Sequence, residues 1–412
     1  MPDAPARTPL PISRRACEAP PSPIRKLEPS ARAAEERGTR IYSLNIGQPD
    51  ICTAPSFLAS ARQEEGTVLA YGPSGGVYAL RAAMTGYYRG LGLAVDEANL
   101  IVTTGGSEAL LFALMGTADP GGEVLTPEPC YPNYRGFAVM AGLDLVAIPT
   151  SIETGFALPP PEAFEAGIGP KTRAIILCSP GNPTGAVYPP EALRALVELA
   201  RRRGIFVISD EVYREFVYDG LKPSSILRVP GAEDVAIVVD STSKRLSACG
   251  ARVGCLVTKH DGLLDAVLRF AQARLSAPVL EQKGALAAMG ASAPFVSESV
   301  AEYQRRRDVA LAELSRIPGV LAPTPQGAFY LMARLPVRSS DDFCRWLLDD
   351  FSSDGETVML APGGGFYATP GRGEQEVRIA YVLKEAPLRR ALALVGQALD
   401  RYRETPAARE SA

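Results

Sequence analysis

The stretch DSTSK at residues 240–244, followed by Arg252 eight residues after its lysine, is the part of the sequence that most clearly indicates the fold. It comes directly after the apolar run VAIVV at 235–239, which predicts a buried strand. Strand ends in α/β sheets commonly form ligand sites, and flanking glycines allow the backbone to direct Arg252 toward Lys244. This pattern suggests a buried amine that forms a Schiff base, with hydroxyl groups and an arginine that bind a phosphate. A lysine in a surface loop is the alternative.

Apolar runs alternate with helical patterns over a large part of the chain. Further strands are predicted at 100–104, 123–125, 173–178 and 205–209, and helices at 77–89, 107–114 and 190–203. Near-continuous apolar strands separated by helices favour a mostly parallel sheet that is covered by helices on both faces. A long helical stretch from 263 to 309 is expected next, and short strands at 329–332 and 377–381 indicate a smaller α+β domain.

Composition limits the classes of protein to which the chain can belong. Its 412 residues suggest about two domains, and 46% apolar with 22% charged residues is ordinary for a globular protein. A net charge of −3 with both signs interspersed argues against nucleic acid or an anionic membrane as a partner, and no apolar run reaches the roughly 20 residues that span a bilayer. The single histidine, His260, is expected in a surface loop, which argues against Ser-His-Asp catalysis and histidine-rich metal sites.

The cysteines and the start of the chain indicate a cellular compartment. The seven cysteines have no CxxC spacing, and the proline- and arginine-rich start lacks an apolar signal segment. Reduced thiols and a cytoplasmic location are therefore expected. Residues 1–21 contain few large apolar groups and should form an extended or disordered arm.

Three more loops after predicted strands carry residues that suggest chemistry. The run GGS at 105–107 begins a helix, where free N–H groups and the helix dipole suit a phosphate. The run SPGNPTG at 179–185 is more particular than a turn requires. In the run SDEVY at 209–213, Asp210 ends a buried strand, where its carboxylate needs a partner such as a protonated pyridine nitrogen.

Together these motifs resemble those of a known family. SPGNPTG at 179–185, SDEVY at 209–213 and SxSK at 241–244 with its following arginine stand in the order found in class I/II aminotransferases of fold type I, which use pyridoxal 5′-phosphate (PLP). The resemblance covers about residues 22–402. It implies an α/β large domain, with a mostly parallel sheet of the seven-stranded type between helices, and a smaller α+β domain. It also implies a transaminase that moves an amino group between an L-amino acid and a 2-oxo acid by ping-pong chemistry.

The resemblance gives a role to the motif residues. Lys244 corresponds to the lysine that forms the Schiff base with PLP and moves the proton at the substrate α-carbon. Asp210 corresponds to the carboxylate that pairs with the pyridine nitrogen and makes the ring an electron sink. Tyr213 and Asn182 would hydrogen-bond the 3′-oxygen of the ring, and Tyr131 would stack on the ring.

Other residues would bind the phosphate and the substrate. The phosphate would be held by Gly105, Gly106, Ser107, Ser241, Ser243 and Arg252. Tyr71 resembles a tyrosine that reaches the phosphate bound by the other subunit, which implies a homodimer with shared active sites. Arg378 resembles the arginine that grips the substrate α-carboxylate bidentately, and Gly47 and Asn182 would complete that pocket.

The first expectation for the substrate pair is aspartate with 2-oxoglutarate. Related bacterial aspartate aminotransferases often have a lysine at the position of Ser107, and this chain lacks it. Arg274 lies near the region from which another subgroup supplies an arginine to the distal carboxylate across the dimer. The other candidates for that cation are Arg14, Arg15 and Arg25.

The alternatives keep the cofactor and change the substrate or the reaction. One is an aminotransferase for aromatic or neutral amino acids, and another is a PLP-dependent β-lyase or decarboxylase on the same fold. A PLP-binding transcription regulator would need a DNA-binding domain, and residues 1–30 are too short and proline-rich to form one.

The resemblance and the predicted elements together give an expected domain order. Residues 22–60 would form an N-terminal segment that packs with the small domain, and 61–305 would form the large PLP-binding domain. Residues 306–402 would form the small domain, and 403–412 would be a frayed end.

Overall fold

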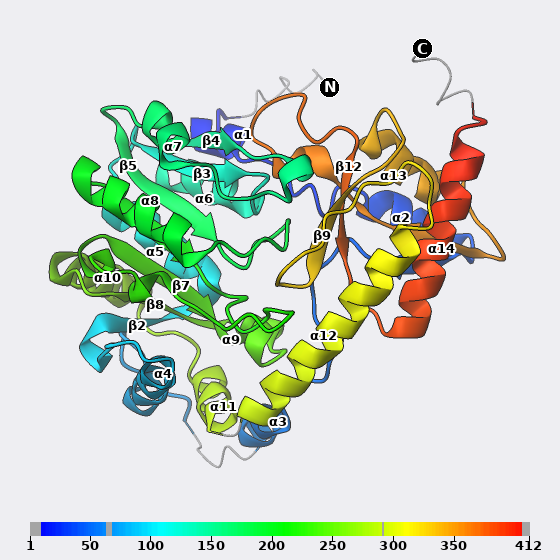
Figure 1. The fold of residues 1–412 in the computed structure, drawn as a ribbon. Coiled ribbons are helices and arrows are strands. Elements are labelled where there is room, and N and C mark those ends of the chain that lie inside the picture. The colour runs from blue at the N-terminus through cyan, green and yellow to red at the C-terminus, as the bar shows by residue number, and fades with distance from the viewer. Residues whose placement is uncertain (1–9, 63–67, 291, 406–412) are drawn as a thin grey trace, which may run out of the picture.

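Two domains of unequal size make up the computed structural model, which describes residues 10–62, 68–290 and 292–405. The large α/β domain and the smaller domain lie side by side in Figure 1, and the long helix α12 (Ser292–Leu314) runs from one to the other. The predicted α/β fold with a second, smaller domain is therefore confirmed.

The large domain is built on a seven-stranded sheet with the order β2-β8-β7-β6-β5-β3-β4. Its strands are β2 (Leu100–Thr104), β3 (Glu123–Glu128), β4 (Asp144–Pro149), β5 (Thr172–Cys178), β6 (Phe206–Asp210), β7 (Ala236–Ser241) and β8 (Val253–Thr258). β8 runs antiparallel to β2 and β7, and the other neighbouring pairs are parallel. The mostly parallel sheet expected from the sequence is present.

The central strands are apolar along their length because both faces of the sheet are covered. In β5, Ala174 and Ile176 pack into one hydrophobic cluster, whereas Ile175 and Leu177 pack into another on the opposite face. The first cluster is covered by α5 (Gly105–Thr117), α6 (Asn133–Ala141) and α10 (Asp261–Arg274). The second is covered by α4 (Tyr78–Gly90), α7 (Pro161–Gly167), α8 (Pro190–Arg203) and α11 (Val279–Met289).

Helix α8 has the bounds that the sequence predicts. It begins at Pro190, whose fixed φ suits the first turn of a helix. It ends at Arg203, because Gly204 adopts a left-handed conformation with φ of 64°. Its buried stripe consists of Leu193, Leu196, Val197, Leu199 and Ala200.

The stretch from 263 to 309 is helical as predicted, but the structure divides it into three helices, α10, α11 and α12. α10 ends at Arg274, and Leu275 has a positive φ of 82°, which a helix cannot continue through. Pro278 then precedes α11 as its N-cap, since proline lacks the N–H group that a helix interior needs.

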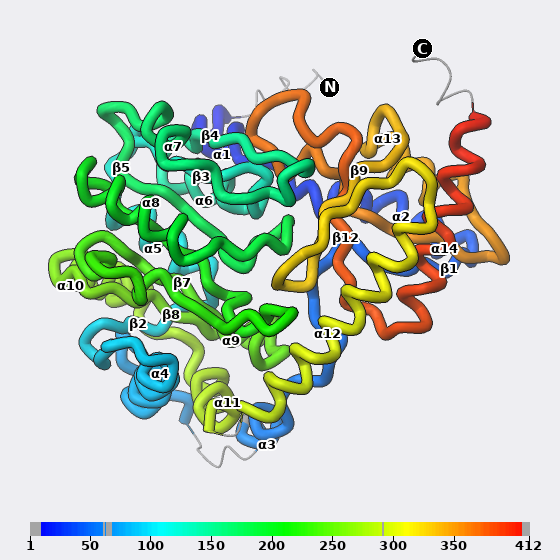
Figure 2. Tube along the Cα trace, viewed as in Figure 1, coloured from blue at the N-terminus to red at the C-terminus, as the bar shows by residue number. Residues whose placement is uncertain are grey.

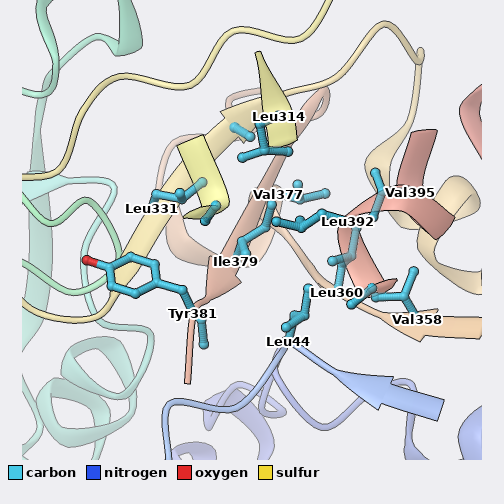
Figure 3. Close-up of a cluster of buried hydrophobic side chains, with 14 of the residues drawn as sticks. Leu44, Leu314, Leu331, Val358, Leu360, Val377, Ile379, Tyr381, Leu392 and Val395 are labelled. Atoms are coloured by element: carbon cyan, nitrogen blue, oxygen red, sulfur yellow. The ribbon is translucent and has the colours of Figure 1, made fainter. Parts of the chain in front are cut away.

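The small domain combines residues from both ends of the chain, as Figure 2 shows by the blue segment among orange and red elements. Its strands are β1 (Arg40–Ser43), which pairs in parallel with β10 (Glu356–Met359), and β12 (Glu376–Ala380), which pairs with β11 (Ala361–Pro362) and β9 (Tyr330–Arg334). Its helices include α2 (Glu28–Glu36), α13 (Ser340–Asp349) and α14 (Glu385–Tyr402). Figure 3 shows their common core, where Leu44 shares a cluster with Val377 and Leu392.

The arm expected at residues 1–21 is partly helical. Arg14–Glu18 form the short helix α1, and Arg15 Nη1 donates a hydrogen bond to Met140 O of α6 at 3.1 Å. The Ser13 side chain caps this helix by accepting a hydrogen bond from Ala16 N. Residues 1–9 and most of the end expected to fray, 406–412, lie outside the described residues.

Helix α3 (Pro55–Arg62) differs from the expectation that the whole segment 22–60 packs with the small domain. It packs against α11, and Phe57 belongs to a hydrophobic cluster of the large domain. A Cβ on Gly284 of α11 would lie 2.8 Å from the Phe57 ring, so this close approach requires glycine. The chain therefore leaves the small domain before residue 55.

Three other features bear on expectations from the sequence. His260 is exposed, and its Nδ1 accepts a hydrogen bond from Leu263 N at the start of α10. The seven cysteines are free thiols. Within the described ranges, no helix has both the length and the apolar character to cross a membrane.

Candidate active site

A cavity of about 510 Å³ lies where the two domains meet. Parallel strands bring their carboxyl ends to one edge of the sheet, and the loops after β5, β6 and β7 form one wall of this cavity. The predicted residues on its wall are Gly47, Gly106, Ser107, Tyr131, Asn182, Asp210, Tyr213, Ser241, Ser243, Lys244, Arg252 and Arg378. The structure thus brings together residues that are far apart in the sequence.

Lys244 lies in the short helix α9 (Thr242–Arg245), which begins directly after β7. Its Nζ donates hydrogen bonds to Gly47 O at 2.9 Å and to Cys249 Sγ at 3.6 Å. The same nitrogen lies 5.9 Å from the centre of the Tyr213 ring. These bonds hold the amine at the cavity, and neither acceptor is a carboxylate.

An anion-binding cradle surrounds the start of α5. Ser241 Oγ and Ser243 Oγ are 2.7 Å apart, and Arg252 lines the same part of the cavity with its Nη1 bonded to Cys249 O at 2.9 Å. Gly105 has φ of 72°, and a Cβ there would lie 2.5 Å from Arg252 Nη2, so the site requires glycine. Hydroxyl groups, free N–H groups of a helix start and a guanidinium together suit a phosphate.

Asp210 ends β6 and is buried. Its Oδ2 accepts a hydrogen bond from the Tyr134 hydroxyl at 2.7 Å, and its Oδ1 accepts one from Val212 N at 3.4 Å. Burial raises the pKa of the Asp210 carboxyl to about 6, although both hydrogen bonds oppose that shift. A cationic ligand beside Asp210 would favour its ionised form.

Tyr213 faces the small domain. Its hydroxyl lies 2.8 Å from the Tyr330 hydroxyl, which in turn donates to Gly47 O at 3.4 Å. Burial raises the pKa of Tyr213 above its ordinary value, so the phenol stays protonated and can donate a hydrogen bond.

Arg378 is a buried arginine of β12 without a carboxylate partner among the described residues. Its Nη1 donates to Asn182 Oδ1 at 3.0 Å, and its Nη2 donates to Asn45 O. Its Nε has no hydrogen-bond partner in the described part of the chain. The guanidinium lies over the rings of Tyr330 and Phe366, at 4.6 and 4.9 Å from their centres. A carboxylate entering the cavity would supply the missing anionic partner.

Arg274 is not on the cavity wall. Its Nε lies 3.3 Å from Glu108 Oε1, and its Nη2 donates to the carbonyl oxygens of Ser74 and Val102 at 3.3 and 3.2 Å. These contacts pair the guanidinium within its own chain, and its expected role in the site of a second subunit stays a prediction.

Tyr71 and Arg25 have exposed side chains. Tyr71 is 81% exposed and lies away from the cavity, so its contact with a second subunit stays a prediction. Arg25 lines the cavity, and its side chain is 71% exposed, with Glu28 Oε1 4.0 Å from its Nε.

Sequence reasoning missed several residues of this site. Tyr134 contacts Asp210, Tyr330 contacts Tyr213, and Cys249 contacts Lys244. Tyr134 lies in the first turn of α6, three residues after Tyr131, and this spacing is a signal that the sequence does contain. Tyr330 has no such signal, because it reaches the cavity only through the docking of the small domain.

The chain matches known proteins over nearly its whole length. Residues 39–395 match the family described as aminotransferase class I and II. The putative aminotransferase YugH of Bacillus subtilis is 34% identical over 379 residues, which are 90% of this chain and 94% of YugH. The structure of Thermus thermophilus aspartate aminotransferase with maleate has a TM-score of 0.85 and 30% identity, and the match covers 94% of this chain and 100% of that one.

A solved alanine aminotransferase from Pyrococcus furiosus is similar to the same degree, with a TM-score of 0.86 and 28% identity over 95% of this chain and 100% of that one. Proteins with different substrates in their names therefore share this fold. The family match and the full-length relatives agree on one assignment. The chain belongs to the class I and II aminotransferases.

Proposed function

We propose that this aminotransferase depends on PLP and prefers aspartate and 2-oxoglutarate as its amino donor and acceptor. The observation that carries the proposal is the placement of Lys244 Nζ on one cavity together with Arg252 and Arg378. A reactive amine, a cation for a phosphate and a cation for a carboxylate are the groups that this chemistry needs.

The residues present fit PLP. The cradle formed by Ser241, Ser243, Arg252 and the start of α5 would hold its phosphate, and Asp210 would pair with its ring nitrogen. A cavity of about 510 Å³ is also within the usual size range for such ligands. When bound, PLP supplies an electron sink for the electrons that remain on the substrate α-carbon.

Three further residues would orient the ring. Tyr213 and Asn182 would hydrogen-bond its 3′-oxygen, and Tyr131 would cover one face. Burial keeps Tyr213 protonated, so its O–H remains a donor. The Tyr330 hydroxyl at 2.8 Å would hold that phenol in place.

Lys244 would move the proton at the substrate α-carbon. Its Nζ is held on the cavity wall by Gly47 O at 2.9 Å and Cys249 Sγ at 3.6 Å, where it can reach a substrate in the cavity. Arg378 would bind the α-carboxylate through two parallel bonds, with Asn182 fixing one side of the guanidinium at 3.0 Å.

An acidic substrate needs a second cation, because a side-chain carboxylate is costly to desolvate without a partner. The cationic residues on the cavity wall are Arg25, Lys244, Arg252 and Arg378. The last three have the roles above, which leaves Arg25. Its side chain is 71% exposed, and Glu28, its one ion-pair partner among the described residues, is 4.0 Å away. We therefore propose Arg25, in place of Arg274, as the partner of the distal carboxylate.

We also propose that the protein acts as a homodimer in the cytoplasm. The free cysteines support a reducing compartment, and the exposed side chain of Tyr71 is free to reach a second subunit.

Replacement of Lys244 tests the reaction. Lys244→Ala should abolish transamination, because both the Schiff-base amine and the proton carrier are lost, whereas Lys259→Ala of the exposed loop should be fully active. The assay should follow amino acid and 2-oxo acid together. Equal amounts of the two products identify a transaminase, whereas ammonia or carbon dioxide without a new amino acid would identify a lyase or a decarboxylase.

Replacement of Arg25 tests the substrate class. Arg25→Ala should lower kcat/KM for aspartate by roughly fivefold, or about 1 kcal/mol for a partly exposed ion pair, and leave alanine unchanged. Arg32→Ala, on the exposed face of α2, is the matched control. A wild-type preference for aromatic or neutral amino acids would overturn the aspartate assignment.

A further inference from the structure

A group of buried charged residues lies directly behind the active site. This buried charge network consists of Glu211, Arg214, Glu215, Asp240 and Arg245, whose exposed fractions are 1, 0, 9, 2 and 4%. Four of its members are chain neighbours of site residues. Glu211 follows Asp210, Arg214 follows Tyr213, Asp240 precedes Ser241, and Arg245 follows Lys244.

Arg214 joins the ends of two strands. Its Nε donates to Glu211 Oε2 at 2.8 Å, next to the end of β6, and its Nη1 donates to Asp240 Oδ2 at 2.9 Å, on β7. The same Nη1 donates to the Tyr87 hydroxyl of α4 at 2.9 Å. One planar guanidinium therefore fixes the loop that carries Asp210 and Tyr213 against the strand that leads to Lys244.

Arg245 extends the network on the other side. Its Nη1 donates to Glu215 Oε1 at 2.9 Å and lies 3.6 Å from Asp240 Oδ2. Its guanidinium stacks over the Tyr87 ring at 4.1 Å. Arg245, the residue after Lys244, therefore contacts the same carboxylate as Arg214, that of Asp240.

Stability alone does not account for this arrangement. Burying each ion costs several kcal/mol of solvation, and a buried ion pair is often no more stabilising than apolar side chains of the same size. What directional bonds add over apolar packing is a fixed geometry. Here the directional bonds fix the positions of two segments, and residues next to the network in each segment face the cavity.

We propose that Arg214 and Asp240 are positioning residues of the active site, which set the spacing between the segment of Asp210 and Tyr213 and the segment of Ser241 and Lys244. The proposal rests on the proposed function, because these segments would hold opposite parts of PLP. A change in their spacing would misplace the Lys244 amine relative to the ring without touching the Arg378 pocket.

The network also acts on the ionisation of Asp210. The groups that face this carboxyl are Tyr131, Tyr134, Cys178, Glu211 and Asp240. Burial is the main reason for the raised pKa of Asp210, and the negative charges of Asp240 and Glu211 raise it further. Loss of the Asp240 charge should therefore lower the pKa of Asp210, and loss of the Arg214 charge should raise it.

Substitutions of Asp240 and of Arg214 should shift the pH dependence of PLP binding in opposite directions. General damage to the fold would not produce shifts of opposite sign. The affinity for PLP should weaken as the pH falls through the pKa of Asp210, since only the carboxylate pairs with a protonated ring. The midpoint of this change should shift to lower pH in Asp240→Asn and to higher pH in Arg214→Met. Shifts in the same direction, or no shift in either variant, would overturn the electrostatic part of the proposal.

Kinetics test the geometric part. Arg214→Met should lower kcat by about a hundredfold, which is the typical effect of a misplacement near 1 Å, with little change in KM for the amino acid. The matched control is Arg307→Met, which removes another buried arginine that is paired with Asp219 and lies over the Tyr218 ring, outside the cavity wall. If the control lowers kcat equally at an equal loss of melting temperature, the role of Arg214 is only structural.

A third variant, Arg214→Lys, separates the effect of the Arg214 charge from that of its planar shape. It also provides a test if Arg214→Met folds poorly. Arg214→Lys keeps the charge but cannot make both bonds from one planar group, so its pH midpoint should stay near that of the wild type while kcat falls. A fully active Arg214→Lys variant would overturn the positioning role. If Arg214→Met does not fold, Arg214→Lys and the nearly isosteric Asp240→Asn still decide the matter. The wild type reports separately on the proposed function, because it must bind PLP and transaminate whatever the variants do.

Discussion

At the scale of single residues, Gly47 shows how much the site depends on a position without a side chain. A Cβ on Gly47 would lie 1.7 Å from the Tyr330 hydroxyl oxygen, so no other residue fits unless the tyrosine moves. The carbonyl of Gly47 accepts from Lys244 Nζ at 2.9 Å. One backbone position therefore holds both the amine and, through Tyr330, the Tyr213 phenol.

We expect Gly47→Ala to lower the free energy of unfolding by roughly 1–3 kcal/mol, as overpacking does, and to lower kcat/KM through the displacement of Tyr330. Gly86→Ala is the control, because nothing lies within 4 Å of a Cβ at that helical position of α4. The control should gain roughly 0.5–1 kcal/mol. Chemical denaturation and steady-state kinetics measure both effects, and a Gly47→Ala variant as stable and active as the control would contradict the steric argument.

The Asp210 carboxyl gives a second prediction at this scale, and its sign follows from its pKa of about 6 in the folded protein. An acid whose pKa rises on folding favours the folded state at low pH. That contribution is complete below the unfolded pKa near 4 and is lost as the pH rises through about 6. In ligand-free protein at pH 8, Asp210→Asn should therefore increase the free energy of unfolding by roughly 1–3 kcal/mol.

The same variant should lose transaminase activity, because the amide cannot pair with a protonated ring nitrogen. Denaturant unfolding at pH 4.5 and pH 8 tests the linkage, since the gain should be much smaller at the lower pH. Asp219→Asn is the control of opposite sign, because Arg307 holds the pKa of Asp219 below its ordinary value. A gain for Asp210→Asn that did not depend on pH would contradict the linkage.

At the scale of elements, the sequence predicts best where the chain marks its own ends. α8 is bounded by Pro190 and Gly204, and its bounds are predicted correctly. β8 has no such marks. Only the four residues of α9 and a short turn separate it from β7, so the sequence does not show where this strand begins. The sequence does not predict α6, because its run NYRGFAVMA mixes aromatic, glycine and β-branched residues, which weakens the helical pattern.

The residues of the active site also differ in how well the sequence predicts them. Residues in motifs at strand ends are predicted to meet, because parallel strands end at one edge of the sheet. Tyr330 and Tyr134 depend on how the small domain and α6 pack, and no local pattern reports such contacts. The partner of Arg274 within its own chain, Glu108 on α5, is hidden from the sequence in the same way, because the sequence shows only an arginine at a helix end.

Arg274 links α10 to α5 and to β2, and this role leads to a prediction about stability. Arg274→Ala should lower the free energy of unfolding by roughly 1–3 kcal/mol, because Glu108 and two carbonyl groups lose a buried donor. It should change kcat/KM for aspartate and for alanine by the same factor. Arg269→Ala, exposed on the same helix, is the control. A loss confined to aspartate would return Arg274 to the substrate pocket.

At the scale of the whole molecule, one exposed apolar stretch supports the proposed dimer. Val68, Leu69, Tyr71 and Tyr78 are 79, 65, 81 and 69% exposed. Exposed apolar groups that lie close together commonly mark a protein interface. If the dimer shares its active sites, Tyr71 and Lys244 of one complete site come from different chains.

Mixing two inactive or impaired variants tests this arrangement. Tyr71→Ala and Lys244→Ala subunits should form hybrid dimers in which one of the two sites has both native residues. Random exchange of equal amounts should restore about a quarter of the native sites. Activity should therefore rise above the mean of the separate variants after the subunits are unfolded and refolded together. Activity that equals this mean would contradict shared sites.

The pairing of β1 with β10 has a consequence for the order in which the protein is made. Arg40 pairs with Glu356, so the first strand of the small domain emerges from the ribosome long before its partner. At about 5–20 residues per second, the roughly 300 intervening residues take about 15 to 60 seconds to synthesise. Until then Leu27, Tyr42 and Leu44 lack a large part of their core, whereas every strand of the large sheet has been made once Thr258 is added. In the cell, a segment that is translated before the large domain is therefore among the last to fold.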